Sequence, residues 1–132
     1  MSAPSVGIDL VEVAAVEAAI ARHGRRYLER VYTPGELRDC GDPSPSPQRL
    51  AARFAAKEAA HKALGSGDVL VFHEIEVVVG AHGGAPTLSL HGATSAAAHQ
   101  DGRRSISLSL THEAGLAAAV VLALPDPSGG PR

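Results

Sequence analysis

The sequence predicts a single α+β domain with one long central helix and antiparallel strand pairs. Its 132 residues are enough for one hydrophobic core but too few for two domains. A run rich in Ala follows Pro47 and reaches Gly65 without another proline, which predicts the helix. Residues 105–111 alternate between apolar and hydroxyl side chains, and a tight turn leads into residues 114–124, which predicts a strand hairpin.

A strand and a helix are expected at the N-terminus. Residues 6–11 form a short β-rich run that carries one acid, Asp9, and the apolar residues Val13, Val16 and Ile20 then recur at helical spacing. An acid inside an apolar strand can be a cap or an exposed edge residue, or it can present a hard-metal ligand from a rigid element. Both interpretations of Asp9 are open at this point.

Four arginines follow, at spacings that would place them on one side of a helix, although Gly24 can break that helix locally. They are Arg22, Arg25, Arg26 and Arg30. Such a stripe is most often a solvated face. Its functional interpretation is a docking surface for an acidic partner, because complementary charge speeds encounter and sets orientation.

Capping and turn signals predict the remaining elements. Thr33, Pro34 and Glu36 have the arrangement of a capping box, so a short helix begins at Pro34. Residues 114–124 could be helical by propensity, but the preceding tight turn and the pair Val120-Val121 favour a strand. The expected elements are helices over residues 34–40, 48–64 and 92–100 and strands over residues 75–79, 87–90, 105–111 and 114–124. Residues 125–132 are rich in Pro and Gly and are expected to form a disordered tail.

Both lysines of the chain, Lys57 and Lys62, lie in the central helix, whereas ten arginines supply the other positive charges. This bias indicates that both positions need a compact ammonium rather than a planar guanidinium. Glu58 and Lys62 are one helical turn apart, on the face that carries Phe54. They can form a surface ion pair worth about 0.3–0.5 kcal/mol. Alternatively, Glu58 is partly buried and needs a stronger partner, such as a divalent metal.

Composition restricts the class of protein. A net charge of −2 and a pI near 6.4 argue against general affinity for nucleic acids. The single cysteine, Cys40, excludes an internal disulfide and a cysteine-based zinc cluster, as is typical of a reducing compartment. No apolar run approaches the length of a membrane span, and the first residues lack the features of a signal peptide. We therefore expect a cytoplasmic protein.

Common catalytic and nucleotide-binding motifs are missing from the sequence. His112 ends the alternating strand, where a substrate could reach it, but it is one of seven histidines. No H-E-x-x-H pattern, Walker-type loop or G-x-G-x-x-G occurs, so neither a zinc hydrolase nor an ordinary nucleotide fold is supported.

Three separated motifs nevertheless resemble one enzyme family. They are Gly7-Ile8-Asp9, Phe54-Ala55-Ala56-Lys57-Glu58-Ala59 with Lys62-Ala63-Leu64-Gly65, and Ser109-Leu110-Thr111-His112. Between them lie Thr33-Pro34-x-Glu36-Leu37, Phe72-x-x-Ile75-Glu76-Val77 and Gly84-Ala85-Pro86. In this order and spacing, over residues 5–124, they resemble the small 4′-phosphopantetheinyl transferases of the holo-acyl-carrier-protein synthase type. The resemblance implies an antiparallel sheet packed on the central helix, and a homotrimer with a site at each subunit boundary.

The resemblance also implies an activity, the transfer of phosphopantetheine from coenzyme A to a serine of an apo acyl carrier protein, with magnesium as cofactor. By that similarity Asp9 and Glu58 bind the metal, while Arg53, Lys62 and His112 bind coenzyme A. Glu58, Lys62 and His112 are the expected catalytic residues, with Glu58 as the preferred base for the serine proton and His112 as the alternative. Magnesium suits two carboxylates because phosphate oxygens and water complete its ligands.

One departure from the family pattern concerns carrier docking. Family members commonly have an arginine early in the first helix, where this chain has Ala14 and Ala15. Docking through Arg22, Arg25 and Arg26 can compensate. Two rival functions are a non-catalytic module that binds carrier protein and a coenzyme A hydrolase that uses the same metal site. The carrier itself can belong to fatty-acid or polyketide synthesis.

Overall fold

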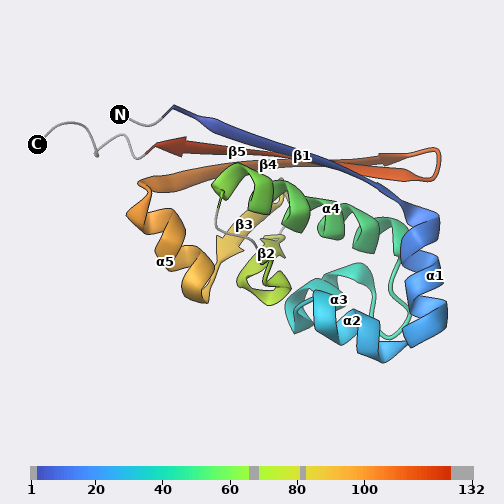
Figure 1. Cartoon of the computed structure of the whole chain (residues 1–132). Coiled ribbons are helices and arrows are strands. Elements are labelled where there is room, and N and C mark those ends of the chain that lie inside the picture. The colour runs from blue at the N-terminus through green and yellow to red at the C-terminus, as the bar shows by residue number, and fades with distance from the viewer. Residues whose placement is uncertain (1–2, 66–68, 81–82, 126–132) are drawn as a thin grey trace, which may run out of the picture.

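The computed structural model describes residues 3–65, 69–80 and 83–125 (Figure 1). In chain order, these residues form β1 (Ser5–Glu12), α1 (Val13–His23), α2 (Arg25–Val31), α3 (Pro34–Cys40), α4 (Pro47–Leu64), the 3₁₀ turn η1 (Phe72–Glu74), β2 (Ile75–Val78), β3 (Thr87–Leu90), α5 (Gly92–Gln100), β4 (Arg103–Glu113) and β5 (Leu116–Pro125). The expected helices and strands are confirmed, with ends within two residues of the prediction. The predicted tail over residues 126–132 lies outside the described residues.

Three antiparallel strands in the order β1-β5-β4 form the main sheet, and β2 and β3 form a separate antiparallel pair. β5 returns beside β4 through Ala114 and Gly115, which have φ angles of 54° and 79°. The structure therefore confirms the predicted hairpin and excludes a helix after residue 115. In this register Ala119 lies between Asp9 on β1 and Leu110 on β4.

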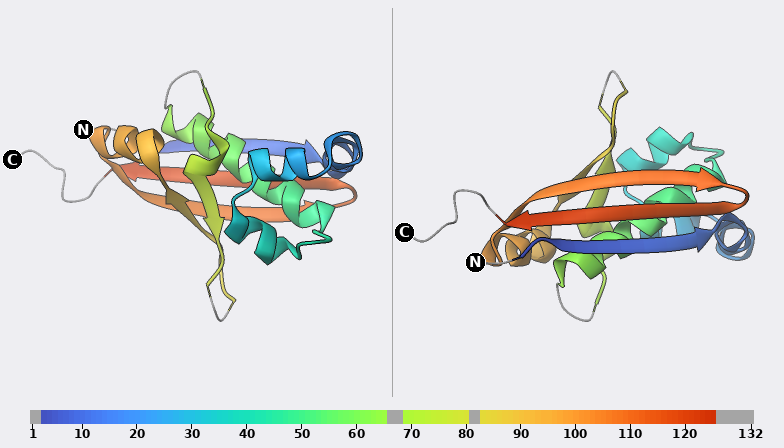
Figure 2. Two further views of the ribbon diagram at one scale, coloured as in Figure 1. Left: turned by 90° about the horizontal axis from the view of Figure 1, so that it is seen from below. Right: turned by 90° about the horizontal axis from the view of Figure 1, so that it is seen from above.

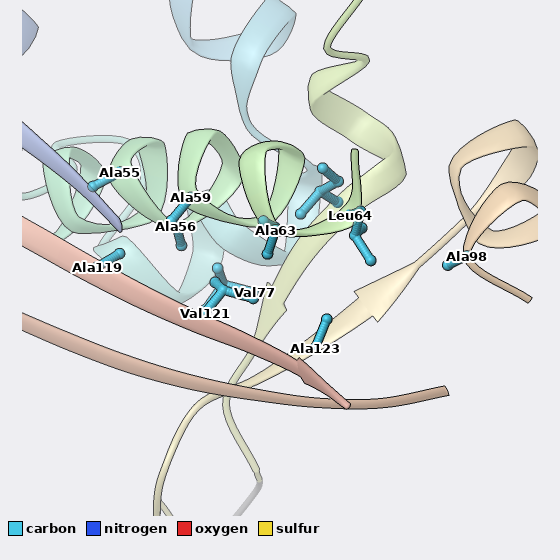
Figure 3. Packing of buried hydrophobic residues seen from close by; sticks show 12 residues of the cluster. Ala55, Ala56, Ala59, Ala63, Leu64, Val77, Ala98, Ala119, Val121 and Ala123 are labelled. Carbon is cyan, nitrogen blue, oxygen red and sulfur yellow. The ribbon is translucent and has the colours of Figure 1, made fainter. Parts of the chain in front are cut away.

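The central helix α4 lies across one face of the sheet and packs against it through alanines (Figure 3). Ala59 on the helix and Ala123 on β5 are fully buried, and Ala119 is 2% exposed. These small side chains permit an unusually close approach, because a Cβ added to Gly7 would lie 1.9 Å from the carbonyl oxygen of Ala59. Gly7 thus lets β1 lie directly on α4, which fixes the position of Asp9 relative to the helix.

A second buried cluster lies between the first three helices and the N-terminal half of α4. The Tyr32 hydroxyl donates to the carbonyl oxygen of Leu50 at 3.1 Å and so ties the end of α2 to α4. The capping box predicted for α3 is confirmed, since the Glu36 N–H donates to Thr33 Oγ1 and the Thr33 N–H donates to Glu36 Oε1. No helix among the described residues is long and apolar enough to cross a membrane.

The arginine stripe is divided between two helices, because the chain breaks at Gly24 as the sequence allowed. α1 ends at His23, and Gly24 adopts φ 58° and ψ −138° before α2 begins at Arg25. Glycine adopts such a positive φ without the steric cost that a side chain would add. Arg22 therefore belongs to α1, whereas Arg25, Arg26 and Arg30 belong to α2.

No described element covers the sheet face opposite α4 (Figure 2). This face carries apolar side chains. Val6, Ile8 and Leu10 on β1 are 64%, 66% and 63% exposed, and Val120 and Leu122 on β5 are partly exposed beside them. Contiguous apolar patches on soluble proteins usually mark an interaction site. This face has the character of a surface on which another protein chain packs.

Candidate active site

Asp9 and Lys62 meet where β1 lies on α4. The Lys62 ammonium donates to Asp9 Oδ1 at 3.1 Å and to the carbonyl oxygen of Ile8 at 3.1 Å. The Asp9 side chain is mostly buried, at 18% exposed, while that of Lys62 is 54% exposed. The carboxylate partner of Lys62 is therefore on β1, and the structure does not show the surface pair with Glu58 that helix spacing allowed.

Glu58 lies beside this pair, on the same side of α4. Ser5 Oγ donates to the carbonyl oxygen of Ala63, and Gly7 touches Ala59, so the strand and the helix run in opposite directions. Asp9, two residues farther along β1, consequently lies beside the helical turn that contains Glu58. Glu58 is partly buried, and its carboxylate forms no hydrogen bond or ion pair with another described residue.

The two carboxylates suit a hard divalent cation. Glu58 is partly buried and has no hydrogen bond or ion pair with another described residue, so no protein group occupies its carboxylate oxygens. Magnesium takes oxygen ligands and is usually held by one or two carboxylates together with water and phosphate. Within residues 3–65, 69–80 and 83–125, no group of three or more Asp, Glu, His or Cys side chains could hold a metal. Asp9 and Glu58 offer oxygen donors of the kind that magnesium takes.

His112 lies in a pocket of about 380 Å³ at the end of the sheet, where the β4–β5 turn approaches the N-terminus of α4. The lining includes Ser46, Gln48 and Arg49. Ser46 caps the helix, since its Oγ accepts from the Arg49 N–H at 3.3 Å. An arginine and the N-terminal end of a long helix favour an anion in this pocket, and the Glu113 carboxylate in the same lining opposes it. No sequence motif distinguishes Ser46 or Arg49 as site residues.

His112 and Asp9 are well separated within one chain. The register aligns Asp9 with Ala119, and the next row on the same face aligns Ala117 with His112. β1 and β4 are two strand spacings apart, so the two Cα atoms are separated by roughly 12 Å. One chain therefore brings Asp9, Glu58 and Lys62 together and places His112 in a second group of residues.

Arg53 belongs to neither of these clusters. It lies nine residues before Lys62, and a rotation of about 100° per residue puts the two side chains on opposite sides of α4. Arg53 is 7% exposed, and its Nη1 donates to the carbonyl oxygen of Arg49, which lines the His112 pocket. Its Nε is buried and has no hydrogen-bond partner in the described part of the chain. This unpaired donor is available for a ligand only if the side chain moves.

Lys57 forms a buried ion pair that the sequence analysis did not predict. Its Nζ lies 2.7 Å from Glu36 Oε1 and donates to the carbonyl oxygens of Ile75 and Phe72 at 2.7 and 2.9 Å. Both charged side chains are fully buried, and Glu36 Oε2 also accepts from the Val77 N–H. Burial lowers the pKa of Lys57, while the Glu36 carboxylate opposes that change. The bias toward arginine did signal Lys57, but nothing in the spacing identified Glu36 as its partner.

The proposed docking arginines are not equivalent. Arg25 forms ion pairs with Asp42 and, at 3.4 Å, with Glu29. Arg22 and Arg26 are exposed and form no hydrogen bond or ion pair with other described residues. The charges of Arg22 and Arg26 are therefore free to meet a partner, whereas Arg25 links α2 to the loop after α3.

Known proteins are similar to this chain in both sequence and fold. The family model of the 4′-phosphopantetheinyl transferase superfamily matches residues 5–121. The holo-[acyl-carrier-protein] synthase of Koribacter versatilis is 44% identical over 119 residues, and that of Carboxydothermus hydrogenoformans is 45% identical over 117 residues. Each alignment covers 88% of this chain and 94% of the relative. The crystal structure of the Helicobacter pylori holo-[acyl-carrier-protein] synthase in complex with coenzyme A has a TM-score of 0.77 and 33% identity, covering 89% of this chain and 98% of that one.

Proposed function

Because the chain belongs to the 4′-phosphopantetheinyl transferase superfamily, we propose that it transfers the phosphopantetheine group of coenzyme A to a serine of an apo acyl carrier protein. The observation that carries this proposal is the match, over nearly the whole length, to holo-[acyl-carrier-protein] synthases. One such enzyme, from Helicobacter pylori, has a similar fold and was crystallised with coenzyme A. The products are the holo carrier protein and adenosine 3′,5′-bisphosphate.

The reaction needs an attacking oxygen and a stabilised leaving group. The serine Oγ attacks the β-phosphorus of coenzyme A, the bond to adenosine 3′,5′-bisphosphate breaks, and the serine proton passes to a base. Glu58 is the proposed base because its carboxylate carries no competing hydrogen bond or ion pair from the described residues. His112 is the alternative. Lys62 would place its charge on the phosphate oxygens and stabilise the leaving group.

Asp9 and Glu58 are the residues that would hold magnesium. When bound, this ion supplies a Lewis acid that neutralises charge on the pyrophosphate. The fit rests on their oxygen donors and on the close packing of β1 against α4 at Gly7. We expect Asp9→Ala to lose turnover steeply at limiting magnesium, and near-normal turnover there would refute the role of Asp9.

Coenzyme A also needs the second cluster, around His112. The pocket with Arg49 suits one of its phosphates, and Arg53 lies one turn of α4 farther on. Because His112 is separated from Asp9 within one chain, we propose that both clusters meet across a subunit boundary in a homotrimer. The exposed apolar sheet face with Ile8 at its centre offers a surface for that assembly.

Mass spectrometry of an apo acyl carrier protein, incubated with the protein, coenzyme A and magnesium, tests the transfer. A mass increase equal to one phosphopantetheine group on the carrier is the expected result. Release of phosphopantetheine with an unmodified carrier would indicate a coenzyme A hydrolase instead. Binding of the carrier with no change in either compound would indicate a non-catalytic binding module. Fatty-acid and polyketide carriers are compared side by side.

A further inference from the structure

The ion pair between Lys62 and Asp9 uses a carboxylate that the proposed reaction needs for a cation. Lys62 Nζ lies 3.1 Å from Asp9 Oδ1, and the pair forms although Glu58 is one helical turn away on the same face. Glu58 thus stays free of an ammonium partner in the described structure, whereas Asp9 does not. The lysine therefore neutralises one particular member of the carboxylate pair.

We infer that Lys62 is an internal counter-ion: its ammonium pairs with Asp9 in place of a divalent cation and moves away from Asp9 when that cation binds. The inference rests on the proposed function, because it assigns two successive partners to the same lysine. In the free protein Lys62 pairs with Asp9. In the loaded site its ammonium is released toward the phosphates of the substrate.

The packing around the pair makes the lysine, and not the strand, the part that moves. A Cβ at Gly7 would overlap the carbonyl oxygen of Ala59, so β1 has no room to shift toward α4. Asp9 is mostly buried, whereas the Lys62 side chain is more than half exposed on a flexible four-carbon stem. Only a change of side-chain rotamer is needed to separate the two charges.

Two thermodynamic consequences follow from this arrangement. Lys62 competes with the cation for Asp9, so the free protein binds the cation more weakly than Asp9 and Glu58 alone would. A phosphate ligand that draws Lys62 away removes this competition, so coenzyme A and the cation strengthen each other's binding. Such coupling is reciprocal, because each ligand must change the affinity of the other by the same factor.

The test is the affinity of the full-length protein for Mn²⁺, followed by electron paramagnetic resonance without substrate. Lys62→Met keeps the length of the side chain and removes its charge. We expect it to bind Mn²⁺ about two- to fivefold more tightly than the unaltered protein, the range expected for loss of a partly exposed ion pair. Lys62→Arg keeps the charge and can form a bidentate pair with the carboxylate. Its affinity for Mn²⁺ should therefore be equal to or weaker than that of the unaltered protein.

A matched control separates local competition from a general change in charge. Arg30 on α2 is exposed and has no ion pair with the described residues, so Arg30→Met removes the same charge away from the site. It should leave the Mn²⁺ affinity unchanged. Equal or weaker binding by Lys62→Met, or equal tightening by Arg30→Met, would overturn the inference.

Adding coenzyme A distinguishes this inference from the proposed function. Coenzyme A should tighten Mn²⁺ binding in the unaltered protein, and the factor should shrink in Lys62→Met. If the unaltered protein bound no Mn²⁺, the carboxylate site and the inference would fall together. If Mn²⁺ bound equally to the unaltered protein and to Lys62→Met, and the unaltered protein still modified the carrier, the inference alone would fail.

Discussion

At the scale of single residues, the two lysines of α4 illustrate how differently one residue type is used. Lys57 is fully buried with three acceptors, and Lys62 is half exposed with a carboxylate on a neighbouring strand. A compact ammonium suits both environments, as the sequence indicated. The partners, Glu36 and Asp9, could not be identified from the sequence because they depend on how the elements pack.

Lys57→Met should destabilise the protein by about 3–5 kcal/mol, because it leaves the buried Glu36 carboxylate without its counter-charge. Lys62→Met is the matched control and should cost less than about 1 kcal/mol, since the Lys62 side chain is exposed. Urea denaturation measures both changes in the free energy of unfolding. Similar costs at the two positions would refute the structural importance of the Glu36–Lys57 pair.

Substitutions at Glu58 and His112 decide which residue is the base. Glu58→Gln keeps the shape and a weak oxygen ligand but loses the charge, so kcat should fall severely even at saturating magnesium. A residue that only held the metal would be rescued by excess magnesium. The assignment moves to His112 if magnesium restores kcat in Glu58→Gln while His112→Ala is inactive and still binds coenzyme A.

At the scale of elements, the sequence predicted most helices and strands because their signals are local. The capping box at Thr33 and the alternation over residues 105–111 depend on neighbours in the chain. Gly24 was likewise a local signal for a break in the arginine stripe, and its positive φ separates α1 from α2. The close packing of β1 on α4 could not be predicted from the sequence, since it depends on the fit of Gly7 to Ala59.

Docking of the carrier is expected to use exposed charges of α1 and α2. Charge reversal at Arg22 and Arg26 should raise the apparent KM for an acidic carrier and leave coenzyme A binding unchanged, because neither side chain has a competing ion pair with described residues. The effect should fade in salt, which screens exposed charges over about 8 Å at physiological ionic strength. Arg38→Glu on α3 is the control, and unchanged carrier kinetics at low salt would indicate another docking face.

At the scale of the whole molecule, a single chain neither joins the two groups of site residues nor covers its apolar sheet face with described elements. Asp9 and His112 lie on the two edge strands of the sheet, and the outer sheet face exposes Val6, Ile8 and Leu10. Assembly of several copies would bury the apolar face and could join the two clusters. We therefore expect a homotrimer in sedimentation equilibrium, and a fully active monomer would contradict this expectation.

Subunit complementation tests most directly whether the site is shared between chains. Asp9→Ala and His112→Ala should each be inactive alone, because each lacks one of the two clusters. If the site forms between chains, random mixed trimers retain about a quarter of their sites with both residues intact. Co-refolding or co-expression of the two variants should then restore roughly that share of the transfer of phosphopantetheine to the carrier, measured by mass spectrometry. A mixture no more active than the sum of the two separate variants would contradict a shared site.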